Sequence, residues 1–243
     1  GKAATGKDPP LRRYPVNSPA SASMPEQNAV STTQTAVARS GLYQLFAAVF
    51  SNPTDELLEL MLSGEFQERL DYLSSELPSS ITLDVKQQLE ELDRHKLFIV
   101  YTTLFESGSQ GVSLRELTYS TLTEKALLEE LFRFYQHFGL EFAQGELREL
   151  PDLLPIELEF LHYLTFLEAE ALKTNSQHAN IGALQTAQSD FVNLHPGKWI
   201  GSFLERLQSQ PDSGIYALLA DLLFKFIKQE KLFLAGQTDN LIA

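Results

Sequence analysis

The sequence predicts an all-α protein, a single compact bundle of about eight to ten helices. From Thr33 onward, apolar residues recur three and four positions apart, which is the spacing of one helix face. No stretch alternates apolar and polar residues for long enough to indicate a strand. The chain has 243 residues, of which 43% are hydrophobic and 21% charged, and this is enough for a buried core.

Apolar stripes mark the helices, and punctuating residues mark their ends. The Asn52-Pro53 pair stops the first stripe, and Asp55 is placed to cap the short helix that follows. A loop with two glycines is expected at 107–113. The expected helices run over about 33–50, 55–62, 65–77, 83–106, 121–139, 155–173, 177–193, 197–209 and 213–234.

Residues 1–23 differ from the rest of the chain. They are rich in Gly, Pro, Ser and Ala and carry a net charge of +3, which leaves −16 for residues 24–243. Such a segment buries too little apolar surface to offset its ordering entropy. We expect a disordered leader added ahead of a natural start at Met24, and one domain over 24–243. No apolar run follows Arg12-Arg13, so a twin-arginine export signal is not favoured and a cytoplasmic location is expected.

Composition excludes several classes of function. The chain has no Cys, which excludes disulfide scaffolds, thiolate zinc sites, cysteine-ligated iron–sulfur clusters and cysteine nucleophiles. A net charge of −13 argues against nucleic-acid binding and favours a cationic partner. No apolar run is long enough for a membrane span. The glycine patterns of nucleotide sites and the serine elbow of hydrolases are also missing, so neither an enzyme nor a bound cofactor is predicted.

One acidic segment stands apart. Residues 141–170 contain eight acidic residues and a single base, Arg148. Pro151 and Pro155 interrupt this segment, so a helix is expected to start close to Pro155. Asp152 is placed to accept the free N–H groups of that first turn.

The stretch Glu149-Leu-Pro-Asp-Leu-Leu-Pro-Ile-Glu-Leu-Glu-Phe160 resembles the signature of the TorD/DmsD/NarJ family of all-helical molybdoenzyme chaperones. Tyr101-Thr-Thr-Leu-Phe-Glu-Ser-Gly108 and Leu42-Tyr-Gln-Leu-Phe-Ala-Ala-Val-Phe50 are similar to two further motifs of that family, in the same order. The Leu-Pro-x-x-Leu-Pro form is nearer to the NarJ-like chaperones of type II dimethyl-sulfoxide-reductase enzymes. Leu153 stands where many members carry His, so no role of that His is transferred.

The resemblance implies a non-enzymatic chaperone. Its partner would be the apo catalytic subunit of a molybdopterin-containing reductase or dehydrogenase, together with that subunit's basic-apolar N-terminal or twin-arginine signal. The chaperone would assist cofactor insertion before export or membrane docking. Such a partner calls for an apolar groove between helices with carboxylates at its rim. The implied binding residues are Asp152, Pro155, Glu157, Glu159 and Phe160 from the signature and Tyr101, Phe105 and Glu106 from the second motif, with Tyr119 and His162 added.

Each of these residues also has a structural interpretation. Asp152 can be only a helix cap, Glu157 and Glu159 can be solvated, and the implied aromatic residues Phe160, Tyr101 and Phe105 can be core. The single Trp, Trp199, is expected to anchor packing. If the carboxylates line a groove, reversing the charge of Asp152 and Glu159 should weaken client binding and leave the fold intact.

Two other function classes remain open. An all-helical adaptor unrelated to metalloenzymes would bind a folded partner. A carboxylate-metal enzyme would use Glu159-x-x-His162, but such a site needs a second copy of that spacing, and the other histidines lack a Glu three residues before them. The identity of the client and the oligomeric state are not fixed by the sequence.

Overall fold

The computed structural model describes residues 24–79, 81–140, 150–174 and 178–242. This part of the chain is all-α, as predicted, and its one β-type pairing is an isolated bridge between Arg115 and Leu153. The expected leader, residues 1–23, lies outside the described residues. The helices are α1 (Met24–Phe50), α2 (Asp55–Leu62), α3 (Glu65–Ser75), α4 (Lys86–Glu90), α5 (Arg94–Phe105), α6 (Glu124–His137), α7 (Leu154–Lys173), α8 (His178–Leu194), α9 (Pro196–Gln208) and α10 (Gly214–Ile242).

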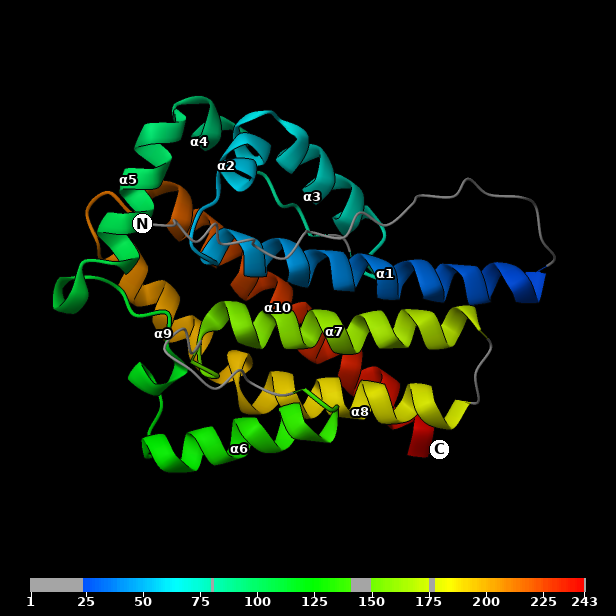
Figure 1. Ribbon diagram of the computed structural model, residues 1–243. Helices are drawn as coiled ribbons and strands as arrows, with labels where there is room; N and C mark the ends of the chain where they lie inside the picture. The colour runs from blue at the N-terminus through cyan, green and yellow to red at the C-terminus, as the bar shows by residue number, and fades with distance from the viewer. Residues whose placement is uncertain (1–23, 80, 141–149, 175–177, 243) are drawn as a thin grey trace, which may run out of the picture.

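Two long helices, α1 and α7, lie side by side through the middle of the molecule (Figure 1). Helix α8 packs on α7, and α10 crosses behind and contacts both α8 and α9. The short helices α2 to α5 cover one side, and α6 lies on the opposite side next to α8 (Figure 1). None of the helices in the described part of the chain has the length and apolar run that crossing a bilayer requires.

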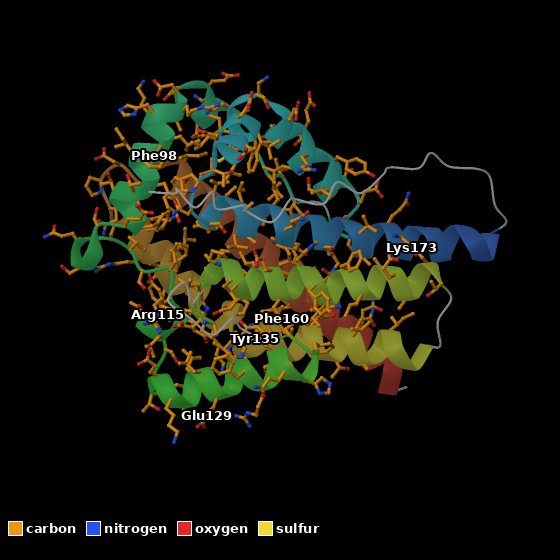
Figure 2. The ribbon with its side chains drawn as sticks, in the orientation of Figure 1. Phe98, Arg115, Glu129, Tyr135, Phe160 and Lys173 are labelled. Carbon is orange, nitrogen blue, oxygen red and sulfur yellow. The ribbon has the colours of Figure 1, made fainter. Side chains whose placement is uncertain are left out.

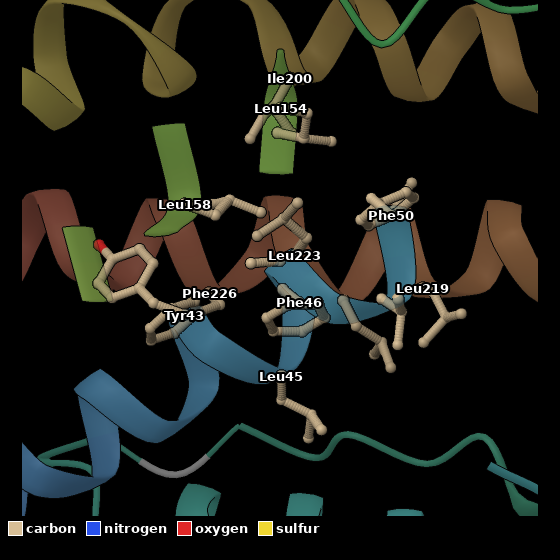
Figure 3. Packing of buried hydrophobic residues seen from close by; sticks show 14 of the residues in the cluster. Tyr43, Leu45, Phe46, Phe50, Leu154, Leu158, Ile200, Leu219, Leu223 and Phe226 are labelled. Atoms are coloured by element: carbon tan, nitrogen blue, oxygen red, sulfur yellow. The ribbon is translucent and has the colours of Figure 1, made fainter. Parts of the chain in front are cut away.

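The core is built where α1, α7 and α10 meet (Figure 3). Phe46 and Phe50 project from α1 toward Leu219 and Leu223 of α10, and all four side chains are buried. On α1 the buried residues Leu42, Leu45, Phe46, Val49 and Phe50 recur three and four positions apart, so most of the apolar stripe recognised in the sequence is the face that α1 buries. Burying one such side chain stabilises the fold by about 1.5–3 kcal/mol.

Two local expectations were wrong. The segment 83–106 is not one helix but α4 and α5, because Asp93 adopts an extended backbone and its side chain accepts a hydrogen bond from the Lys96 N–H, which starts a new helix. Asp55 does not cap α2. Thr54 does, through its hydroxyl and the Leu57 N–H, while Asp55 pairs with Arg94 at 2.8 Å.

A buried ionic network joins four helices. The guanidinium of Arg39 on α1 donates to both carboxylate oxygens of Glu230 on α10 at 2.8–3.0 Å. It also donates to Glu168 on α7 at 2.9 Å and to Gln188 on α8 at 2.6 Å. Burial alone would lower the pKa of Arg39, but the charges of Glu230 and Glu168 raise it above its ordinary value. Arg39 therefore stays charged in the core.

Replacing Arg39 by Met should remove the only cation of this network and leave two carboxylates buried together. Breaking a buried ion pair from one side costs about 3–5 kcal/mol, because the remaining charge is uncompensated. We expect Arg39→Met to lower the free energy of unfolding by that amount in urea denaturation. Arg94→Met is the matched control, since its pair with Asp55 is exposed and should be worth less than about 1 kcal/mol. Equal effects of the two substitutions would contradict the prediction.

Candidate functional site

The acidic signature begins α7, as predicted, with Leu153 as the residue before the helix and Pro155 in its first turn. Asp152 does not cap α7. Its carboxylate is buried and accepts hydrogen bonds from Arg115 Nε at 3.0 and 3.2 Å and from the Leu117 N–H at 3.3 Å. The cap interpretation of Asp152 is therefore wrong, because its side chain points to the 114–117 segment and not to its own helix.

Backbone hydrogen bonds hold the same two segments together. The Glu116 N–H donates to the Asp152 carbonyl and the Leu154 N–H donates to the Leu114 carbonyl, both at 2.8 Å. A short 3-10 turn follows at Glu116–Thr118. An irregular segment between α5 and α6 thus takes its position from the start of α7. Arg115, labelled in Figure 2, lies at this junction.

Glu157 is buried one turn into α7, so the solvated interpretation of this residue is wrong. Its Oε2 accepts a hydrogen bond from Trp199 Nε1 on α9 at 3.1 Å, and its side chain also lies against that of Glu116. Burial raises the pKa of Glu157 well above its ordinary value, and the negative charge of Glu116 raises it further. Glu116 in turn accepts a hydrogen bond from His195 Nδ1 at 2.9 Å. Burial and the neighbouring charge thus both favour the protonated form of Glu157.

Phe160 and Tyr101 belong to the core. Phe160 packs against Tyr135 of α6 and Phe191 of α8, with ring centroids 4.9 and 4.6 Å away, and Figure 2 shows Phe160 and Tyr135 together between α7 and α6. The hydroxyl of Tyr101 donates to the Phe50 carbonyl at 3.3 Å. Pro155 is buried as well. These residues shape the site from inside and do not reach its surface.

A cavity of about 620 Å³ lies between the 105–119 segment, Leu153 and the end of α9. Of the ten residues singled out in the sequence, Phe105 and Tyr119 line it. Tyr119 stacks on Trp199 with centroids 5.3 Å apart and its hydroxyl donates to the Ser113 carbonyl at 2.8 Å. Burial raises the pKa of Tyr119 to about 12, so its hydroxyl is uncharged.

The remaining predicted residues are placed elsewhere. Glu106 and Glu159 are exposed and do not line the cavity. His162 is half-buried, and its Nδ1 lies 2.9 Å from the Ser40 carbonyl oxygen. Burial lowers its pKa. Within the described ranges no group of three or more His, Asp or Glu side chains is arranged to hold a metal ion.

Three features of the cavity escaped the sequence analysis: Arg115, Arg206 and the wall formed by Gly111. A Cβ on Gly111 would lie 2.7 Å from the Leu104 carbonyl oxygen, so only glycine permits this close turn after α5. The two glycines of 107–113 were the available signal for the wall. Nothing in the periodicity marked the arginines, because Arg115 lies outside the helices and Arg206 is an exposed residue of α9.

Comparison with known proteins gives consistent matches. The sequence pattern of the family described as nitrate reductase delta subunit matches residues 59–205, more than half of the chain. A chlorate reductase assembly chaperone protein of Ideonella dechloratans is 34% identical over 121 residues, which are 49% of this chain and 61% of the relative. The chaperone protein TorD of Vibrio cholerae is 30% identical over 182 residues, 70% of this chain and 79% of TorD.

The match to the chlorate reductase relative thus spans less than two thirds of that protein's length. Among solved structures, a protein of Archaeoglobus fulgidus described as a redox enzyme maturation protein aligns with 78% of this chain and 93% of its own. Its sequence is 21% identical, and the TM-score is 0.47.

Replacing Glu157 by Gln should make stability less dependent on pH. Above about pH 4.5 the unfolded chain loses a proton that the folded chain keeps, so this residue lowers the free energy of unfolding as pH rises toward its raised folded pKa. The slope is at most about 1.4 kcal/mol per pH unit. Urea titrations between pH 5 and 8 should show a flatter profile for Glu157→Gln. The exposed Glu159→Gln is the control, and an unchanged profile for Glu157→Gln would contradict the assignment.

Charge reversal at Asp152 should damage the fold, contrary to the expectation from sequence. Asp152→Lys places a second cation against Arg115 at a fully buried position. The expected loss in the free energy of unfolding is about 3–5 kcal/mol. Glu159→Lys makes the same charge change on an exposed side chain and should cost less than about 1 kcal/mol. Chemical denaturation of both variants measures this, and a stable Asp152→Lys protein would show that the ion pair is dispensable.

Proposed function

The chain belongs to the nitrate reductase delta-subunit family, and from this membership we propose that it is a non-enzymatic assembly chaperone. Its client would be the apo catalytic subunit of a molybdopterin-containing reductase or dehydrogenase. The relatives named above are a chlorate reductase assembly chaperone and TorD. A chaperone of this kind acts by binding its client and catalyses no reaction.

The cavity at the family signature is the observation that carries this proposal. Its volume of about 620 Å³ falls in the range of sites that enclose a ligand group. Its floor is fixed by buried contacts, since Asp152 and Leu154 hold the 114–117 segment and Glu157 binds Trp199. A preorganised concave surface of mixed polar and apolar character suits a segment of an unfolded chain, because little ordering of the receptor opposes binding.

Chaperone action follows from a difference in affinity. The immature subunit exposes a segment that the cavity can bind, and the mature subunit has that segment folded or buried. A partner that binds one state better shifts the population toward it by the ratio of the two affinities. Holding the apo form open in this way would leave it receptive to cofactor, and maturation would release the chaperone. We place this action in the cytoplasm, before export or membrane docking.

A basic-apolar N-terminal signal would be recognised by a different part of the surface. Among the described residues, no carboxylate lines the cavity, whereas Glu106, just after α5, and Glu159, in the second turn of α7, are exposed. The net charge of −13 attracts a cationic segment over a distance of about one Debye length. We propose that this negative charge, and not the cavity, attracts the N-terminal signal of the client.

The experiment is capture of the client in source cells with tagged full-length protein. Cells blocked in molybdopterin synthesis should yield several-fold more of one catalytic oxidoreductase subunit than unblocked cells, because the apo form accumulates. Captured protein is identified by mass spectrometry and assayed for molybdopterin. Equal capture of the cofactor-loaded subunit, or recovery only of folded proteins without a molybdopterin site, would overturn the proposal and favour the adaptor alternative.

Tyr119→Ala should reduce capture of that subunit about tenfold, the loss typical of truncating an aromatic contact in an interface. Tyr72→Ala on α3 is the matched control, since Tyr72 is an exposed tyrosine that does not line the cavity. Thermal melts of both variants separate lost binding from lost folding. Undiminished capture by a folded Tyr119→Ala protein would show that the client binds elsewhere.

A further inference from the structure

The charge of the cavity is opposite to the charge of the chain. Arg115 and Arg206 are the two charged residues among the described residues that line it, in a protein with 32 acidic and 19 basic residues. The sequence had suggested a groove rimmed by carboxylates for a cationic ligand. Two carboxylates of the signature, Asp152 and Glu157, are instead buried, and the exposed Glu159 does not line the cavity.

The two arginines differ in how far their charge is compensated. Arg115 donates from Nε to Asp152 at 3.0 Å and from Nη2 to Glu124 at 3.1 Å, so it is neutralised by its own protein. Arg206 lies in the last turn of α9 and is exposed. Its guanidinium has no ion-pair partner among the described residues, which leaves one uncompensated positive charge at the cavity.

The rest of the lining is apolar with hydroxyl groups between. Phe105, Leu114, Tyr119 and Leu153 supply apolar surface, and Ser109, Ser113 and Thr118 supply hydroxyls. Trp199, Phe203 and Arg206 recur at the helical spacing along α9, which brings Arg206 to the face on which Tyr119 stacks. The guanidinium of Arg206 therefore lies beside the aromatic side chains of this face.

We propose that this cavity receives an acidic side chain, Asp or Glu, flanked by apolar side chains of a peptide segment, with the carboxylate paired to Arg206. One uncompensated charge matches the single charge of a carboxylate, whereas a phosphate ester would bring more negative charge than the site offsets. The apolar walls give the neighbouring side chains a place to bury. The assignment of this segment to the immature client rests on the proposed function; the peptide specificity itself does not.

The test uses the full chain and needs no client. Trp199 is the only tryptophan and stacks on Tyr119 in the cavity wall, so its fluorescence reports occupancy. The probes are three pools of acetylated, amidated heptapeptides with Asp, Asn or Lys at the centre and Ala, Leu, Phe and Ser randomised elsewhere. Inorganic phosphate is the fourth probe.

The Asp pool should half-saturate the signal at a concentration about tenfold lower than the Asn pool, the gain expected from one charge-assisted hydrogen bond. Arg206→Gln should abolish this preference, and Arg206→Lys should keep part of it. Arg69→Gln, an exposed arginine of α3 that does not line the cavity, should change nothing.

Several results would overturn the proposal: equal binding of the Asp and Asn pools, stronger binding of the Lys pool, or a preference that survives Arg206→Gln. Saturation by phosphate with exclusion of the Asp pool would assign the site to a small anion. Failure to capture an apo subunit from cells would overturn the proposed function and leave the peptide specificity in place, so the two can be told apart.

Discussion

Four helices of the bundle, α1, α7, α8 and α10, meet at the buried guanidinium of Arg39. Two carboxylates and one amide from three other helices converge on it, and Tyr43 adds a hydrogen bond to Glu230 at 2.9 Å. Charges inside a protein are tolerated only when partners meet with good geometry, so the network permits few alternative registers of α1, α7, α8 and α10. Glu168 lies 14 residues along α7 from Leu154, about 21 Å at the helical rise. Because α7 is straight, the contacts that fix its C-terminal end at Glu168 also fix the position of the signature at its N-terminal end.

At that other end the signature organises a part of the chain that has little regular structure of its own. Leu153 is extended just before α7 starts, and the carboxylate of Asp152 and two backbone groups beside it bind the 114–117 segment. The carbonyl of Pro151 accepts the hydroxyl of Tyr135 at 2.8 Å and ties in α6 as well. The loop that forms the cavity wall is therefore held to α7 by both side-chain and backbone hydrogen bonds.

Features that depend on neighbouring residues, such as helices, could be predicted from the sequence. Features that depend on contacts between distant residues could not. Periodicity located α6, α7 and the part of α1 from Thr33 onward, because each buries one continuous apolar stripe, but it missed that α1 begins at Met24. Pro155 marked the start of α7. The break between α4 and α5 depends on a single cap, Asp93, inside an apolar pattern that reads as continuous. Burial of Asp152 and Glu157 could not be predicted, since their partners Arg115 and Trp199 are 37 and 42 positions away. The cavity is likewise formed by residues far apart in the sequence, so its positive charge could not be predicted from the net negative charge of the chain.

The charge of the chain and the charge of its cavity act at different distances. The excess of 13 negative charges forms a field that reaches about one Debye length and is screened by salt. Arg206 acts at contact, beside an apolar wall where screening is weaker. If a client carries a basic signal, the negative field of the chain would attract that signal. If it also carries a separate acidic-apolar segment, the cavity with Arg206 would bind that segment. Salt would then slow the encounter more than it weakens the bound complex, because steering contributes to association and close contacts to dissociation. On the proposed function, such a division would let the acidic surface attract client chains while the cavity selects among them.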